Sequence, residues 1–296
     1  MKTLYLECNM GAAGDMLMAA LYELMFPEEQ ARFLEMMNRL FPGVEVQPRQ
    51  AVTCGITGTH MDVTVRGEEE HSHDVALGCG HDHIHEHHHD HDHHHEHEHD
   101  HHHEHEHDHD HGHDHEHHHG HDHSHTHHHT APADIYALLD ALDVPAEVKG
   151  AAKAVYARIA DAESKAHGMP VEQIHFHEVG AMDAVADVTG VCLAVHMLRP
   201  DRIAASPVHL GSGQVRCAHG IVPVPAPATA HLLEGVPCYT GDIRGELCTP
   251  TGAALVGRFV SHYGDCPEGR LIRQGTGLGK KDFPRPNCLR AFLLEA

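Results

Sequence analysis

Residues 174–190 read IHFHEVGAMDAVADVTG, and they place two histidines directly before a predicted helix. His175 and His177 are two residues apart, so their side chains point to the same side in extended backbone and diverge in a helix. The Val-Gly pair that follows Glu178 predicts a strand end or loop that leads into a helix starting near Ala181. The segment therefore presents both imidazoles on one side of the chain.

The helix that follows carries two carboxylates on one face, because Asp183 and Asp187 are four residues apart. Imidazole is a good ligand for nickel, zinc and copper, whereas a carboxylate binds harder ions or orients a ligand histidine. The simpler alternative is that Asp183 only stabilises the helix N-terminus. We favour a metal or catalytic site, whose candidate catalytic residues are His175, His177, Glu178 and Asp183.

A glycine turn near the start of the chain is a candidate anion site. Residues 2–8 predict a strand, Gly11 and Gly14 mark a tight turn, and a helix with leucines at helical spacing follows. Free backbone N–H groups at such a helix start attract phosphate or carboxylate. Asp15 either holds a cation beside that anion or only caps the helix. The turn lacks the Gly-Lys-Ser/Thr ending of a Walker A loop.

A second helix start of interest lies in residues 246–259, ELCTPTGAALVGRF. Two hydroxyls beside free N–H groups form a candidate phosphate cradle, although ordinary capping by a threonine before Pro250 is the simpler interpretation. The candidate cofactor-binding residues of both helix starts are Gly11, Gly14, Asp15, Thr249 and Thr251.

A second ligand pair follows in SPVHLGSGQVRCAHG, residues 206–220, where Cys217 and His219 are again two apart. A thiolate and an imidazole there would complete a soft metal site, or Cys217 is an unreactive buried thiol. The candidate metal ligands are His175, His177, Asp183, Asp187, Cys217 and His219.

Residues 67–130 differ from the rest of the chain. The stretch 71–129 holds 32 of the 41 histidines and 15 acidic residues, with no Lys or Arg. It has almost no apolar surface to bury, so we expect a disordered insert. Most of its imidazoles are neutral at pH 7, and their density favours the rebinding of nickel, copper or zinc. The alternative is a solvated low-complexity insert that is merely rich in histidine.

The composition of the 296 residues bounds the class of protein. The formal charge of −24 argues against nucleic acid or an anionic membrane as partner. Nine cysteines without a CxxC pair, and no signal peptide, indicate reduced thiols in the cytoplasm. The longest mainly apolar run, 188–198, is too short to span a bilayer.

The pattern of elements predicts an α+β fold. We expect a small N-terminal α+β lobe in residues 1–66, the insert in residues 67–130, and a larger helix-rich α/β lobe in residues 131–296. Further helices are predicted over 27–40, 132–142, 146–166 and from 229 to 233, and further strands over 44–52, 56–65, 202–205, from 270, and over 287–294.

The motifs, taken in order, resemble those of the LarC family of nickel insertion proteins. The resemblance rests on MGAAGDM, the His-rich insert, HFHEVGAMDAVADVTG, SPVHLGSGQVRCAHG, PVPAPAT and ELCTPTGAAL. It implies insertion of Ni²⁺ into pyridinium-3,5-bisthiocarboxylic acid mononucleotide, a chelatase-type lyase reaction that completes the nickel-pincer nucleotide of lactate racemase. It also implies use of CTP with Mn²⁺ or Mg²⁺ and a homo-oligomer. In longer members CTP binding is attributed to a C-terminal domain that this sequence does not include, so a separately encoded CTP-binding domain is a candidate partner.

Two other functions remain open. The insert favours a non-catalytic nickel storage or delivery protein. A metal-dependent hydrolase built on His175, His177 and Asp183 ranks last, because the sequence lacks HExxH or an equivalent signature.

Overall fold

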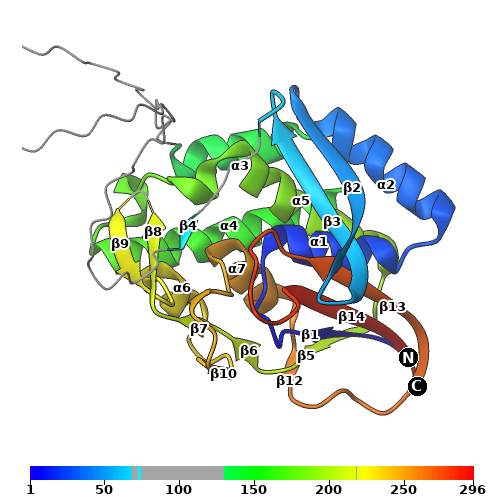
Figure 1. Cartoon of the computed structure of the whole chain (residues 1–296). Coiled ribbons are helices and arrows are strands. Elements are labelled where there is room, and N and C mark those ends of the chain that lie inside the picture. Colours follow the sequence, from blue (N-terminus) through cyan, green and yellow to red (C-terminus); the bar gives the residue numbers. More distant parts are fainter. Residues whose placement is uncertain (69–72, 75–129, 218) are drawn as a thin grey trace, which may run out of the picture. The chain divides into compact units, whose positions relative to one another are not determined.

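A seven-stranded mixed sheet forms the centre of the computed structural model, which describes residues 1–68, 73–74, 130–217 and 219–296 (Figure 1). The predicted disorder of the insert falls outside these residues. In spatial order the strands are β12 (His262–Tyr263), β5 (Arg202–Ala205), β1 (Lys2–Glu7), β14 (Cys288–Glu295), β13 (Arg270–Leu278), β3 (Ile56–Val65) and β2 (Val44–Thr53).

The sheet joins the beginning and the end of the chain. β1 pairs in antiparallel fashion with β14, from Lys2 opposite Glu295 to Glu7 opposite Arg290, and it runs parallel to β5. β3 forms an antiparallel hairpin with β2 and is joined to β13 on its other side. Residues 1–66 and 131–296, which the sequence pattern presents as two lobes, therefore contribute strands to one sheet.

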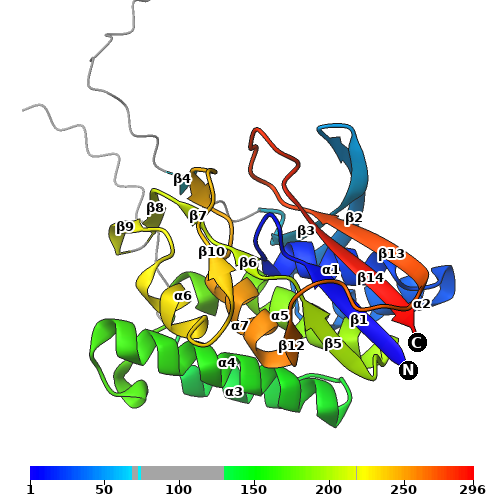
Figure 2. The same ribbon diagram turned by 90° about the horizontal axis from the view of Figure 1, so that it is seen from below.

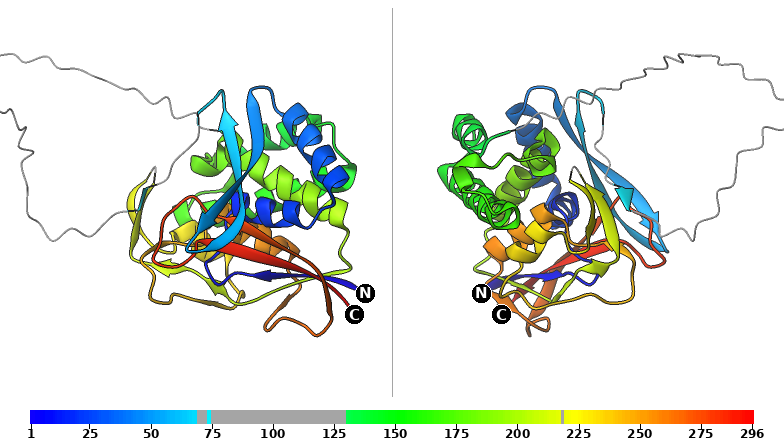
Figure 3. Two further views of the ribbon diagram at one scale, coloured as in Figure 1. Left: turned by 45° about the vertical axis from the view of Figure 1, so that its right-hand side comes forward. Right: turned by 90° about the vertical axis from the view of Figure 1, so that its left-hand side faces the viewer.

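Helices pack on one side of this sheet (Figures 2 and 3). They are α1 (Gly14–Glu23), α2 (Pro27–Leu40), α3 (Pro132–Ala141), α4 (Ala146–His167), α5 (Met182–Leu198), α6 (Pro227–Leu232) and α7 (Pro250–Phe259). The strands alternate as a sheet with two different faces should. Leu4 and Leu6 of β1 join the main core of aliphatic side chains under the helices, whereas Tyr5 packs with Ala204 and Leu294 on the other face.

Most predicted elements are present, with small shifts at their ends. α2 begins and ends at the predicted residues, and Pro27 is its first residue, where a missing N–H costs nothing. The helix predicted from Thr229 begins earlier, at Pro227. Proline fits a first helical position as well as an extended segment, so a Pro-x-Pro spacing alone does not mark the boundary.

Short strands follow β5 and carry the second ligand pair. β8 (Gln214–Cys217) forms a hairpin with β9 (Gly220–Pro223) and pairs on its other side with β4 (His73–Asp74). Two further small sheets pair β6 (Val208–His209) with β10 (Cys238–Tyr239), and β7 (Gly211–Ser212) with β11 (Gly245–Glu246). His219 consequently lies in the turn between β8 and β9.

No helix in the part of the chain that the structure describes is both long enough and apolar enough to cross a lipid bilayer.

Candidate functional site

The segment before α5 is extended at its histidines, as the alternation predicts. Ile174 and Phe176 are buried, whereas His175 is exposed and His177 is half-buried. Phe176 also makes an isolated antiparallel bridge with Thr130, and its N–H donates to the Thr130 carbonyl at 2.8 Å. The two imidazoles thus flank a buried phenylalanine.

Two short 3₁₀ turns and a buried tyrosine fix the chain on either side of these histidines. The turns are η1 (Val171–Gln173) and η2 (Glu178–Gly180). The hydroxyl of Tyr156 on α4 donates to the Val179 carbonyl at 3.0 Å, and its ring lies 5.8 Å from that of Phe176. Because Tyr156 is fully buried, it ties the histidine segment to the core.

Three imidazoles from distant parts of the chain meet at the surface; we call His167, His177 and His219 the imidazole cluster. The ring of His177 meets that of His219 edge-on, with 4.6 Å between centroids. The ring of His167 also lies near that of His219, with 4.7 Å between centroids. The structure therefore brings together His177 and His219, which were predicted, and adds His167, which was not.

A carboxylate supports His167 from one turn earlier in α4. Glu163 Oε2 lies 3.3 Å from His167 Nε2, and the Glu163 side chain is only 15% exposed. Burial raises the pKa of Glu163, the partner His167 opposes that shift, and the charge of Glu178 adds to it. The sequence analysis did not single out His167, although the i, i+4 spacing of Glu163 and His167 is a local signal that could have drawn attention to it.

Burial and neighbouring charges shift the pKa values of two candidate ligands of this region, His219 and Cys217, in opposite directions. The pKa of His219 is lowered by burial and by His167, which leaves a neutral imidazole at pH 7. The pKa of Cys217 is raised, chiefly by burial and also by the charges of Glu178, Glu246 and Glu163. Cys217 is therefore a protonated thiol near the cluster, and a thiol binds metal well only after it loses its proton.

The predicted carboxylates gather elsewhere, between α1 and α5; we call Asp15, Asp183 and Asp187 the carboxylate cluster. α1 and α5 pack together, and a Cβ placed on Gly14 would lie 2.7 Å from Asp187 Oδ2. Only glycine allows this approach. The backbone N–H of Asp15 donates to the Asp187 carboxylate. The N-terminus of α1, predicted to attract an anion, thus already holds a carboxylate of the protein itself.

Charge accumulates in the carboxylate cluster. Burial raises the pKa of Asp187 well above its usual value, Asp15 and Asp183 raise it further, and Lys280 opposes the shift. Burial also raises the pKa of Asp15, against lowering contributions from Lys280 and His60. Asp187 Oδ1 is buried and has no hydrogen-bond partner in the described part of the protein. Both carboxyls are shifted toward their neutral, protonated form.

The second helix start is capped in the ordinary way. The Thr249 hydroxyl accepts the N–H of Gly252 at 3.2 Å, and Thr249 and Thr251 hydroxyls lie 3.0 Å apart. The turn at Gly11 packs against the chain just before this helix, since Ala12 N–H donates to Leu247 O at 3.1 Å. Gly11 has φ of +80°, and a Cβ there would overlap the Leu247 carbonyl, so the turn requires glycine.

Neither the imidazole cluster nor the carboxylate cluster has the geometry of a metal coordination shell. Among the residues that the structure describes, no group of three or more His, Cys, Asp or Glu side chains is arranged to hold a metal ion. In the imidazole cluster the ring planes of His177 and His219 are 82° apart and those of His167 and His219 are 49° apart. Metal binding by these side chains would require a change in their side-chain rotamers.

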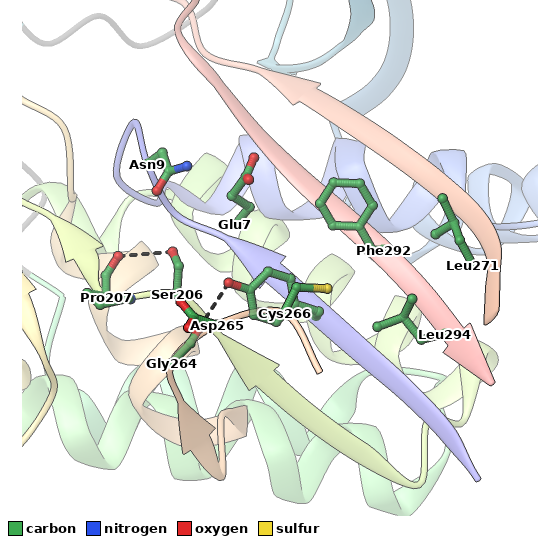
Figure 4. Close-up of a pocket in the computed structure, with 11 residues that line it drawn as sticks. Glu7, Asn9, Ser206, Pro207, Gly264, Asp265, Cys266, Leu271, Phe292 and Leu294 are labelled. Carbon is green, nitrogen blue, oxygen red and sulfur yellow. Dashed lines mark hydrogen bonds between the residues drawn. The ribbon is translucent and has the colours of Figure 1, made fainter. Parts of the chain in front are cut away.

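A cavity lies on the face of the sheet away from the main core (Figure 4). It has a volume of about 580 Å³ and lies where β1, β5 and β12 end. Tyr5 donates to the Gly264 carbonyl at 3.0 Å across its floor. Its lining includes Glu7, Asn9, Asp265, Cys266 and Phe292, and none of the predicted site residues.

Imidazole is a good ligand for borderline metal ions such as nickel, zinc and copper. The comparison with known families agrees: the model of a family described as nickel insertion protein matches residues 4–296. The chain therefore belongs to the nickel insertion protein family.

Individual relatives carry one recurring name. A pyridinium-3,5-bisthiocarboxylic acid mononucleotide nickel insertion protein of Desulfitobacterium hafniense is 46% identical over 163 residues, 55% of this chain and 40% of the relative. Proteins of the same name from Geobacillus kaustophilus and Clostridium kluyveri are each 34% identical over the whole chain. The chain spans 60% and 62% of their lengths. No solved structure matches the chain.

Proposed function

We propose that this chain takes part in the insertion of Ni²⁺ into pyridinium-3,5-bisthiocarboxylic acid mononucleotide. The observation that carries the proposal is the family match over residues 4–296, together with relatives named for this substrate. The product would be the nickel-pincer nucleotide, and its acceptor a lactate racemase-type apoenzyme. Nickel is the cargo of this reaction.

The imidazole cluster has the chemistry that such a transfer requires. The two sulfur ligands of the nucleotide must displace the ligands of the protein from nickel. Neutral imidazoles bind nickel well, and a site of few ligands near solvent releases the ion more easily than four thiolates would. His219 is exposed and His177 half-buried, so a ligand in solution can approach both. We assign nickel binding to these two residues.

The other predicted site residues receive secondary roles. We place His175 and Glu178, which are both exposed, at the approach to the imidazole cluster. Asp183 and Asp187 belong to the carboxylate cluster. We propose that they act by taking up or releasing a proton, and we do not assign them to nickel binding. The nucleotide phosphate would bind near the turn at Gly11 or the start of α7 at Thr251.

We propose that CTP with Mn²⁺ or Mg²⁺ acts through the part of the relatives that this chain does not span. The reaction is then that of a CTP-dependent, chelatase-type lyase. A cytoplasmic location fits the thiols, because every cysteine in the described part of the chain is free.

The test is a reconstituted insertion reaction. The purified chain is incubated with Ni²⁺, the bisthiocarboxylic acid mononucleotide, CTP and Mg²⁺, with and without the additional region of the Geobacillus kaustophilus relative. Mass spectrometry is expected to detect the nickel adduct of the nucleotide when that region is present. Its absence under those conditions would rule out the proposed function.

A nickel storage or delivery protein is the second candidate, and the attachment of the His-rich insert favours it. β4, just before the insert, pairs with β8, and Thr130, just after it, pairs with Phe176. Replacing residues 75–129 by a short Gly/Ser linker separates the functions. If the protein is a storage protein, the linker variant should lose most of its nickel-binding capacity, measured by equilibrium dialysis, and with it its function. An insertion protein would keep its activity at saturating nickel, and we expect this result.

A further inference from the structure

We propose that His167 is a third nickel ligand beside His177 and His219, and that Glu163 is the positioning residue that orients its ring. The inference deepens the proposed function and rests on it for the identity of the metal. Its test measures nickel binding, so it can fail while insertion activity is intact, and the reverse also holds.

The first argument is the convergence of three separate elements. His167 is the last residue of α4, His177 precedes η2, and His219 lies in the β8–β9 turn. Their rings are nevertheless linked through His219, with centroid distances of 4.6 and 4.7 Å. Three imidazoles from elements that are far apart in the sequence therefore lie together at one place on the surface, and imidazole nitrogens are good ligands for nickel.

The second argument is the partner of His167. A ligand histidine usually donates its other ring N–H to a carboxylate, which fixes the tautomer and the ring orientation. Glu163 Oε2 stands 3.3 Å from His167 Nε2, which leaves Nδ1 of His167 for the metal. The Glu163 side chain is 15% exposed and the His167 side chain 32%, so the orienting carboxylate is the more buried of the two.

The third argument is a comparison with another histidine of the same chain. His231 of α6 also pairs with a carboxylate, since its Nδ1 lies 2.8 Å from Glu234 Oε1. The Glu234 side chain is 63% exposed, as expected for an ordinary surface pair. Glu163, by contrast, is largely buried, and a buried carboxylate partner holds the orientation of its histidine more firmly than an exposed one.

Two segments of the cluster pair with described chain next to the His-rich insert. β4 pairs with β8, which leads to His219, and Thr130 pairs with Phe176, the neighbour of His177. The described chain on either side of the insert is therefore paired with the segments that carry His219 and His177.

The test uses the full chain with every histidine of residues 71–129 replaced by serine, so that only the folded part binds nickel. Isothermal titration with Ni²⁺ gives Kd, and nickel X-ray absorption counts imidazole ligands. We expect His167→Ala to weaken binding at least about tenfold and remove one imidazole. Glu163→Gln should weaken binding about tenfold, within the range known for such partners, and keep the imidazole count.

The matched controls are His231→Ala and Glu234→Gln, which remove the other histidine–carboxylate pair and should leave Kd within about twofold of the parent. Circular dichroism melting without metal checks that each variant folds, and His167→Gln replaces His167→Ala if the latter does not. An unchanged Kd and an unchanged imidazole count in the folded His167 variant would overturn the inference. Equal weakening by the His231 variant would overturn it as well.

Discussion

Sequence spacing located two members of the imidazole cluster but missed the third. His177 and His219 each stand two residues from another candidate ligand, and that local pattern is visible without a structure. His167 became a candidate only when α4 was placed beside the β8–β9 turn. For the same reason the sequence did not show that Asp187, predicted as a ligand beside the histidines, instead lies against Asp15 where α1 packs on α5. Spacing along the chain reports shared faces and carries no information on contacts between elements.

At the same scale, the buried carboxyl of Asp187 makes stability depend on pH. Its pKa in the folded protein is raised, so the folded state favours the protonated form. The stabilising effect is complete below the unfolded pKa and is lost as the pH rises through the folded pKa. Asp187→Asn, which keeps an acceptor for the Asp15 N–H, should therefore be more stable than the parent at pH 8. We expect a Tm gain of about 2–4 °C, the shift that about 1 kcal/mol causes in a domain of this size.

Thermal melts from pH 4 to pH 9 without metal check this prediction. The gain should shrink as the pH falls, because both proteins are then uncharged at residue 187. Glu172→Gln removes the same charge from an exposed site and serves as control. A variant that is less stable than the parent at pH 8 would show that the negative charge of Asp187 is needed for folding.

At the scale of elements, local signals predicted helices and strands well and their partners poorly. Proline at the first position and a hydrophobic period of 3.6 residues are enough to define α2 and α7. The neighbours of β1 are β14 and β5, which lie about 290 and 200 residues later in the chain. No local pattern encodes such a pairing, so the single sheet could not be distinguished from two lobes.

The start of α7 gives an element-scale prediction. Thr249 caps this helix through the Gly252 N–H, so Thr249→Ala should lower the free energy of unfolding by about 1 kcal/mol. Thr249→Ser keeps the acceptor and should lose less than half of that. Urea denaturation of both variants measures the difference. Equal stability of the alanine variant and the parent would mean that the cap is dispensable and would free Thr249 for the proposed phosphate site.

At the scale of the whole molecule, the ends of the chain share one core. β1 has both of its strand neighbours after residue 200, and β3 is joined to β13. A fragment of residues 1–66 would leave the backbone groups of β1 unpaired and half of its core exposed. We expect this fragment to show no cooperative thermal transition by circular dichroism, whereas the full chain should melt cooperatively. A cooperative fragment would restore the two-lobe organisation.

At this scale we propose that the insert and the folded part have different roles in metal handling. The sequence shows where most of the histidines are, and the structure shows that chain next to them is fixed beside the imidazole cluster. In our account many weak sites collect nickel and one folded site transfers it. Controlled exchange with a sulfur-bearing nucleotide would depend on how the folded site positions its ligands.

The most direct measurement is the rate at which the nickel-bound nucleotide appears, followed by mass spectrometry. The reconstituted reaction would use the chain without insert histidines, at saturating nickel, with the further region of the Geobacillus kaustophilus relative. Our account predicts that His177→Ala/His219→Ala lowers this rate at least about a hundredfold, the loss of two ligand contacts of about 1.4 kcal/mol each. His231→Ala should leave the rate unchanged. A double variant that inserts nickel at the parent rate would contradict the assignment of transfer to the imidazole cluster.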